Sequence, residues 1–193
     1  MKSSAKIFRR RVYHSPGELV SAASEILHHS PDFKSARHSG RVSRAFAEKI
    51  MLSVTQVNDC RYCRFGHTKV ALEAGVSEDE ITRIARGDLD EFPQDEAPGL
   101  LYAQHFAETG GAPDPAATAR LIDFYGEQTA AEIGAYIRMI TVGNLLGNTF
   151  DAFLSRFRRR PAPDSSFISE LSTLFLAVLG AIPFGIIFGI RLL

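Results

Sequence analysis

The chain has 193 residues, about the length of one domain, which excludes a large multidomain assembly. Hydrophobic residues make up 45% and charged residues 23% of it, so the chain can bury a core and is not an intrinsically disordered protein. Its 22 basic and 22 acidic side chains cancel, whereas nucleic-acid-binding proteins usually carry a basic excess, so we expect no nucleic-acid partner. The charge is uneven, because residues 1–50 hold ten basic and four acidic side chains.

Residues 1–40 are predicted to form a basic extension with one helix, near residues 16–29. Ser15 followed by Pro16 is typical of a helix start, because serine caps the first turn and proline fits the first helical position. No run of seven or more apolar residues follows the basic start, so the sequence predicts no export signal.

Residues 41–160 are predicted to form an all-α catalytic domain, because they contain no convincing alternating strand pattern. Asp114-Pro115 indicates a helix start, and the segments Ser77–Glu80 and Thr129–Glu132 both fit the capping-box pattern. Apolar residues recur at helical spacing in 41–57, so one stripe of that helix should face the core. The helices are expected near residues 41–57, 60–74, 78–86, 96–109, 115–125 and 130–155.

The end of the chain is predicted to be a linker, residues 161–170, followed by a transmembrane helix, residues 171–190. This last segment is twenty residues without a charge, and at about 1.5 Å per residue it would span the roughly 30 Å hydrocarbon core of a bilayer. The arginines at 156 and 158–160 should stay on the cytoplasmic side. The sequence therefore predicts a tail-anchored membrane protein with a cytoplasmic catalytic domain. An apolar helix buried in an oligomer is the alternative.

Two cysteines three residues apart carry the clearest chemical signal. Asn58 and Asp59 are good capping residues, so Cys60 is expected in the first turn of a new helix, where the helix dipole favours a thiolate. Cys60, Cys63 and His67 would fall within an arc of roughly 60° on one helix face. Since His67 follows Cys63 by one turn, its imidazole is placed to take the proton of that thiol.

Glu48 reaches this group only if the chain turns back. On one unbroken helix it would lie roughly 18 Å from Cys60. A break at the capping residues, followed by a helical hairpin, would instead place Glu48 level with His67. The order Glu48, His67, Cys63 is then a carboxylate that orients an imidazole, which activates a sulfur nucleophile. Two arguments differ on the reactive sulfur, because the helix dipole favours Cys60 and the histidine spacing favours Cys63. We give the histidine more weight, because a general base one turn away acts directly on one thiol.

Glu48, the Cys60-Arg61-Tyr62-Cys63 segment and His67, at these spacings, resemble the carboxymuconolactone decarboxylase family, and within it the AhpD-like alkylhydroperoxidase branch. The resemblance extends through the next helix and more loosely to about residue 150. It implies an AhpD-like helical bundle, a homo-oligomer that reduces peroxides with a dithiol. Lactone decarboxylation is not expected, because decarboxylase members lack this dithiol.

The resemblance also implies a role for each residue. Cys63 would attack the peroxide and become a sulfenic acid, Cys60 would resolve it to a disulfide, and His67 and Glu48 would relay protons. An external dithiol would restore the thiols, with no bound organic cofactor and no metal. Two alternatives remain open at this point: a zinc site formed by both sulfurs, His67 and Glu48, and a non-catalytic membrane-tethered scaffold whose dithiol is a redox switch.

Overall fold

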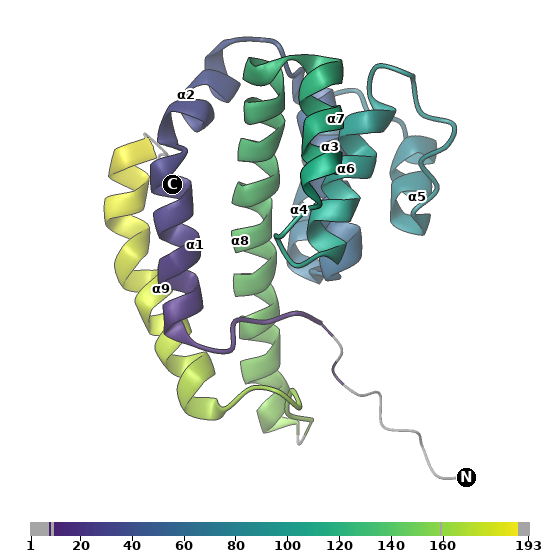
Figure 1. The fold of residues 1–193 in the computed structure, drawn as a ribbon. Helices are drawn as coiled ribbons and strands as arrows, with labels where there is room; N and C mark the ends of the chain where they lie inside the picture. Colours follow the sequence, from purple (N-terminus) through teal and green to yellow (C-terminus); the bar gives the residue numbers. More distant parts are fainter. Residues whose placement is uncertain (1–7, 9, 159, 189–193) are drawn as a thin grey trace, which may run out of the picture.

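All regular secondary structure in the computed structural model is helical within the residues it describes, which are residue 8, residues 10–158 and residues 160–188. The predicted all-α fold is therefore confirmed. The helices are α1 (Pro16–His28), α2 (Ser30–His38), α3 (Arg44–Asn58), α4 (Arg61–Glu73), α5 (Glu78–Arg86), α6 (Ala97–Glu108), α7 (Pro115–Tyr125), α8 (Glu127–Phe157) and α9 (Phe167–Phe188). The long helix α8 runs through the middle, with α1 and α9 on one side and the helices from α3 to α7 on the other (Figure 1).

Helix α3 is the centre of the larger half, because it packs against α4, α5, α6 and α8. All ten residues from 46 to 55 are buried, so α3 is enclosed on every side rather than along the single predicted stripe. The main hydrophobic core forms between α3, α6 and α8 and includes Ile50, Leu100 and Ile137, none of which is exposed to solvent. Polar side chains on α3 are consequently held inside the protein.

Several predicted helix starts are confirmed. Ser77 and Glu80 form the predicted capping box at the start of α5, and Asp114 accepts a hydrogen bond from the backbone N–H of Ala116 before α7. The capping box predicted at Thr129 is wrong, because α8 begins two residues earlier, after Gly126.

Glu132 has a structural role in place of that cap. Its carboxylate is buried and accepts hydrogen bonds from Ser35 at 2.6 Å, from Ser39 at 2.9 Å and from Arg41 at 2.5 Å. These contacts fasten α2 and the segment after it to α8, because a buried carboxylate has to be paired.

The N-terminal extension contains two helices, so the prediction of one helix is wrong. Helix α1 ends at His28, and α2 starts at Ser30 with Pro31 in its first turn. A proline has no backbone N–H to continue the preceding helix, which explains the break. Both helices pack against α8.

The predicted transmembrane helix is not supported. Among the described residues, no helix combines the length and the apolar character that crossing a membrane requires. Helix α9 begins at Phe167, inside the predicted linker 161–170, and residues 189 and 190 of the predicted anchor lie outside the described residues.

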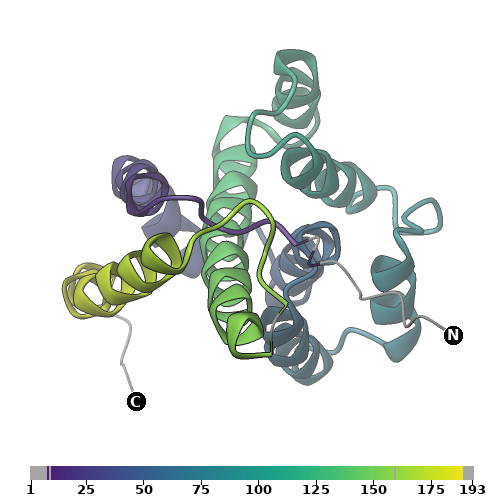
Figure 2. The same ribbon diagram turned by 90° about the horizontal axis from the view of Figure 1, so that it is seen from below.

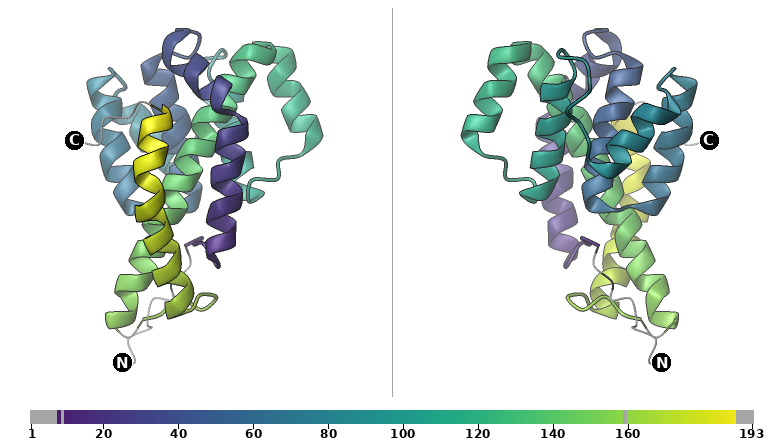
Figure 3. Two further views of the ribbon diagram at one scale, coloured as in Figure 1. Left: turned by 90° about the vertical axis from the view of Figure 1, so that its left-hand side faces the viewer. Right: turned by 90° about the vertical axis from the view of Figure 1, so that its right-hand side faces the viewer.

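Helix α9 packs lengthwise along α8 and α1, as the views from below and from the side show (Figures 2 and 3). Its polar residues Glu170 and Thr173 face inward and are fully buried, and Glu170 accepts a hydrogen bond from Nε of Arg156 at 2.5 Å. Apolar residues lie on the outer face, where Ile168 is 78% and Val178 70% exposed. The apolar run that predicted a membrane helix therefore belongs to a helix fixed to the body by a buried ion pair.

Candidate functional site

The chain reverses between α3 and α4 as predicted, so the two helices form a hairpin. Asp59 ends α3 in the left-handed conformation, with φ of 54°, which aspartate tolerates better than most residues. The expected position of Cys60 is wrong by one residue: Cys60 precedes the first turn of α4 as its N-cap. Its sulfur accepts the backbone N–H of Cys63 at 3.3 Å.

The two cysteine sulfur atoms lie 2.6 Å apart, and both cysteines are free thiols. Cys60 is completely buried, whereas Cys63 is partly exposed. A disulfide bond is about 2.05 Å long, so oxidation of the two thiols to a disulfide would require only a small approach of the sulfurs. Cys63 is the sulfur that a molecule arriving from solvent meets first.

The hairpin also brings Glu48 to His67. The carboxylate Oε2 of Glu48 lies 2.8 Å from Nδ1 of His67, with side-chain exposures of 9% and 27%. His67 lies one turn after Cys63 on α4. The predicted carboxylate–imidazole pair therefore forms one helical turn from Cys63. Glu48 binds Nδ1 of His67, so the hydrogen bonds of the site join His67 to Glu48 and Cys63 to Cys60.

The two thiols differ in their electrostatics. The pKa of Cys60 is lowered to about 7, mainly because the Cys63 thiol donates a hydrogen bond to its sulfur, with burial opposing this effect and the positive charge of Arg10 assisting it. The pKa of Cys63 is raised, because its proton is shared with Cys60, the thiol is partly buried and the Cys60 charge lies beside it. The negative charge of the reduced pair is therefore favoured on Cys60, and its main cause is the hydrogen bond from Cys63.

Helix α8 contacts the dithiol at Gly147, which sequence reasoning missed. A Cβ atom at this position would lie 2.8 Å from Sγ of Cys60 and 3.9 Å from Sγ of Cys63, so only glycine fits without a shift. The signal that could have found it is the pair Gly143 and Gly147, one turn apart within the last predicted helix of the domain.

A group of charged side chains surrounds the start of α4 and was also missed. Asp59 accepts hydrogen bonds from Arg10 at 3.1 Å and from Arg64 at 2.7 Å. Asp151, on α8, forms ion pairs with both Arg10 and Arg61. Arg10 is 49 positions from Asp59 in the sequence, so no local pattern could have predicted its place.

The zinc alternative is not supported by the geometry. Over the described residues, no group of three or more histidine, cysteine, aspartate or glutamate side chains could hold a metal ion. The sulfurs contact each other, whereas the imidazole of His67 is bonded to Glu48. The four candidate residues therefore form two adjacent pairs rather than one ligand shell.

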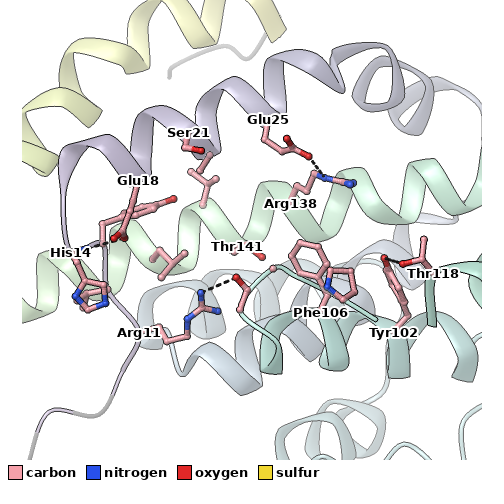
Figure 4. Close-up of a pocket in the computed structure, with 18 residues that line it drawn as sticks. Arg11, His14, Glu18, Ser21, Glu25, Tyr102, Phe106, Thr118, Arg138 and Thr141 are labelled. Carbon is pink, nitrogen blue, oxygen red and sulfur yellow. Dashed lines mark hydrogen bonds and ion pairs between the residues drawn. The ribbon is translucent and has the colours of Figure 1, made fainter. Parts of the chain in front are cut away.

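A cavity of about 810 Å³ reaches the carboxylate–imidazole pair. Glu48 and His67 form part of its wall, and most of the remainder is apolar, including Phe33, Met51 and Met139. A separate cavity of about 760 Å³ lies between α1, α8 and the segment that joins α6 to α7 (Figure 4). The first cavity is lined by Glu48 and His67 among the predicted site residues, whereas Cys60 and Cys63 do not line it.

Comparison with protein families supports the resemblance read from the motif. Residues 32–90 match the carboxymuconolactone decarboxylase family. Neither the curated proteins nor the solved structures give a match to the chain. The matched segment contains Glu48, Cys60, Cys63 and His67 and does not single out the AhpD-like branch. The part of the chain that forms α3, α4 and the dithiol is therefore similar to the carboxymuconolactone decarboxylase family.

Proposed function

We propose that this protein is an AhpD-like thiol peroxidase that reduces organic hydroperoxides with the dithiol of Cys60 and Cys63. The observation that carries the proposal is the arrangement of two contacting free thiols next to a hydrogen-bonded Glu48–His67 pair. The family includes both decarboxylases and alkylhydroperoxidases, and an enzyme of the second kind needs this dithiol.

The first step is attack by Cys63, the sulfur that is accessible. The reduced pair holds one proton between two sulfurs 2.6 Å apart, so transfer of that proton to Cys60 produces the Cys63 thiolate. This thiolate attacks the terminal oxygen of the hydroperoxide, the O–O bond breaks, and Cys63 becomes a sulfenic acid. The departing alkoxide takes a proton from the imidazolium of His67 and leaves as an alcohol.

The second step is closure of the disulfide. Cys60 attacks the sulfur of the Cys63 sulfenic acid, and the hydroxyl group leaves as water after taking up the remaining proton. One dithiol and one hydroperoxide thus give one disulfide, one alcohol and one water. An external dithiol then reduces the disulfide by thiol–disulfide exchange, and in this half of the cycle the protein acts as a disulfide reductase.

The Glu48–His67 pair and the adjoining cavity support an organic substrate. Glu48 accepts the Nδ1 proton of His67, which fixes the tautomer of the imidazole and orients Nε2. The mostly apolar walls of the 810 Å³ cavity favour a hydroperoxide with an apolar group over hydrogen peroxide. The family resemblance further implies a homo-oligomer, which sedimentation of the purified protein would test.

The proposal is tested by peroxide consumption with dithiothreitol as reductant. Cumene hydroperoxide should be consumed by the wild-type protein and not by Cys63→Ser, whereas Cys60→Ser should stop at a sulfenic acid that dimedone labels at Cys63. If wild-type protein consumes no hydroperoxide, the proposal is wrong and the non-catalytic redox scaffold is the better explanation. Full activity of Cys63→Ser would refute the assigned nucleophile.

A further inference from the structure

The N-terminal segment, residues 10–14, runs along α8 and past the start of α4. The side chain of Asn148 donates one hydrogen bond to the carbonyl oxygen of Arg11 at 3.0 Å and another to that of Asn58 at 2.7 Å. The backbone N–H of Tyr13 donates to Thr149 at 3.0 Å. One face of α8 thus fixes both this segment and the end of α3, so their relative position is defined by protein contacts.

Arg10 occupies the point where these elements meet. Its guanidinium bridges Asp59, the residue before Cys60, and Asp151, which lies one turn after Gly147 on α8. Arg10 therefore connects the residue that precedes the dithiol to the helix that packs against it. The side chain of Asp151 is only 10% exposed, so its charge has to be balanced by neighbours.

The charged groups at the start of α4, where Cys60 lies, come from every element packed there. The N-terminal segment contributes Arg10, the end of α3 contributes Asp59, α4 contributes Arg61 and Arg64, and α8 contributes Asp151. Three arginines against two aspartates leave a surplus of one positive charge. The Glu48–His67 pair lies one turn further along α4 and belongs to the site already described.

We propose that Arg10 is a positioning residue for the dithiol. Arg10 holds the start of α4 through Asp59 and Asp151, and it supplies the surplus positive charge that stabilises the Cys60 thiolate. Both Arg10 and Asp151 lie outside residues 32–90, so the ion pair between them lies outside the segment that matches the family. The inference depends on the proposed function only for its catalytic consequence, because the ionisation of a dithiol can be measured without a peroxide.

The test is the pH dependence of thiolate absorbance in the reduced full-length protein. Arg10→Gln should raise the midpoint of the first ionisation by about 0.5 to 1 pH unit, which lowers the thiolate fraction at pH 6 about three- to tenfold. Asp151→Asn should shift the midpoint downward, since it removes a negative charge. Arg10→Lys keeps the charge and should stay close to wild type.

Arg11→Gln is the matched control. Arg11 is the next residue, but its guanidinium donates to the carbonyl oxygens of Ala107 and Gly110, at 3.2 and 3.3 Å, beside the other cavity (Figure 4). Its replacement should leave the midpoint unchanged, and thermal unfolding would verify that each variant is folded.

Two results would overturn the inference. If Arg10→Gln and Asp151→Asn shift the midpoint in the same direction, the two side chains act only by holding the loop. If Arg10→Gln has no larger effect than Arg11→Gln, the charge of Arg10 does not act on the dithiol. Absence of peroxidase activity in the wild type would instead refute the proposed function and leave the shift in the midpoint intact.

Discussion

Gly147 offers the sharpest test of how the dithiol is built. In Gly147→Ala, the added methyl group would lie 2.8 Å from Sγ of Cys60 and 3.5 Å from Cδ2 of Tyr62. Favourable contacts between non-bonded heavy atoms occur at about 3.5–4.0 Å, so the sulfur or α8 must move. Cys60 cannot move freely, because its sulfur caps α4 by accepting the Cys63 N–H.

The magnitude follows from two opposing effects. Replacement of glycine by alanine inside a helix stabilises it by about 1 kcal/mol, and overpacking of a dense region costs about 1–3 kcal/mol. Gly143 is the matched control: it lies one turn earlier on α8, and a Cβ there meets no atom within 4 Å. Gly143→Ala should therefore be stabilised by up to about 1 kcal/mol, and Gly147→Ala should be about 1–3 kcal/mol less stable than that control.

Thermal unfolding of the reduced proteins would measure this difference, which corresponds to about 2–12 °C in melting temperature for a chain of this size. Gly147→Ala should also form the disulfide more slowly after addition of peroxide, because the sulfurs are displaced. In a Cys60→Ala background the methyl group has room, so the cost at residue 147 should largely disappear. Equal melting temperatures for the two alanine variants, or a cost that persists without the Cys60 sulfur, would refute the reasoning.

Three other changes test the relay, the thiol electrostatics and α9. Glu48→Gln removes the charge that stabilises the imidazolium of His67, so peroxide-driven disulfide formation should slow by up to about 100-fold in stopped-flow fluorescence, with partial rescue by Glu48→Asp. Because the pKa of Cys60 is lowered to about 7 in the folded protein, its ionisation stabilises the reduced fold at pH values above the pKa of the unfolded thiol. This stabilisation is lost as the pH falls through 7. The raised pKa of Cys63 destabilises the reduced fold above about pH 8.5, because the unfolded thiol ionises there and the folded one does not. The free energy of unfolding of reduced wild type, relative to that of Cys60→Ser, should therefore rise between about pH 6.5 and 8.5 and not beyond. Glu170→Gln leaves Arg156 without its charged partner and should cost about 1–3 kcal/mol in urea denaturation, whereas Glu73→Gln, at an exposed pair 3.7 Å apart, should cost less than about 0.5 kcal/mol.

The proximity of the candidate site residues could be predicted from the sequence because they are connected by local geometry. Glu48 and His67 are 19 positions apart, and one reversal at Asp59 brings them together. Helical periodicity and capping preferences decide such a short-range arrangement, so spacing alone was sufficient. The exact helix start was not predictable, because a cysteine sulfur replaces the usual serine or aspartate oxygen as the cap.

Helix α9 shows where pattern reasoning fails. A charge-free run has the same composition whether a bilayer, a partner or the protein itself contacts it, and only tertiary packing distinguishes these cases. Here the residues that decide the outcome are Arg156 and Glu170, which the prediction placed in different segments. Their ion pair, in which Glu170 is fully buried, fixes the helix along α8, while apolar residues of α9 pack inward at Leu176 and Ala177 and are exposed on the outer face at Ile168 and Val178.

The features that complete the site come from distant parts of the chain. Gly147 on α8 lies against Cys60, 87 residues away in the sequence, and Arg10 and Asp151 pair with each other and with Asp59 and Arg61, the two neighbours of Cys60. The local hairpin supplies the sulfurs and the relay, but a reduced dithiol is a nucleophile only to the extent that one sulfur is ionised. The hydrogen bond from Cys63 lowers the pKa of Cys60 most, and Arg10 assists it from outside the hairpin. An isolated peptide of residues 44–73 should therefore have a first thiol pKa above that of the full-length protein, and an equal value in that peptide would show that α8 and Arg10 are not needed.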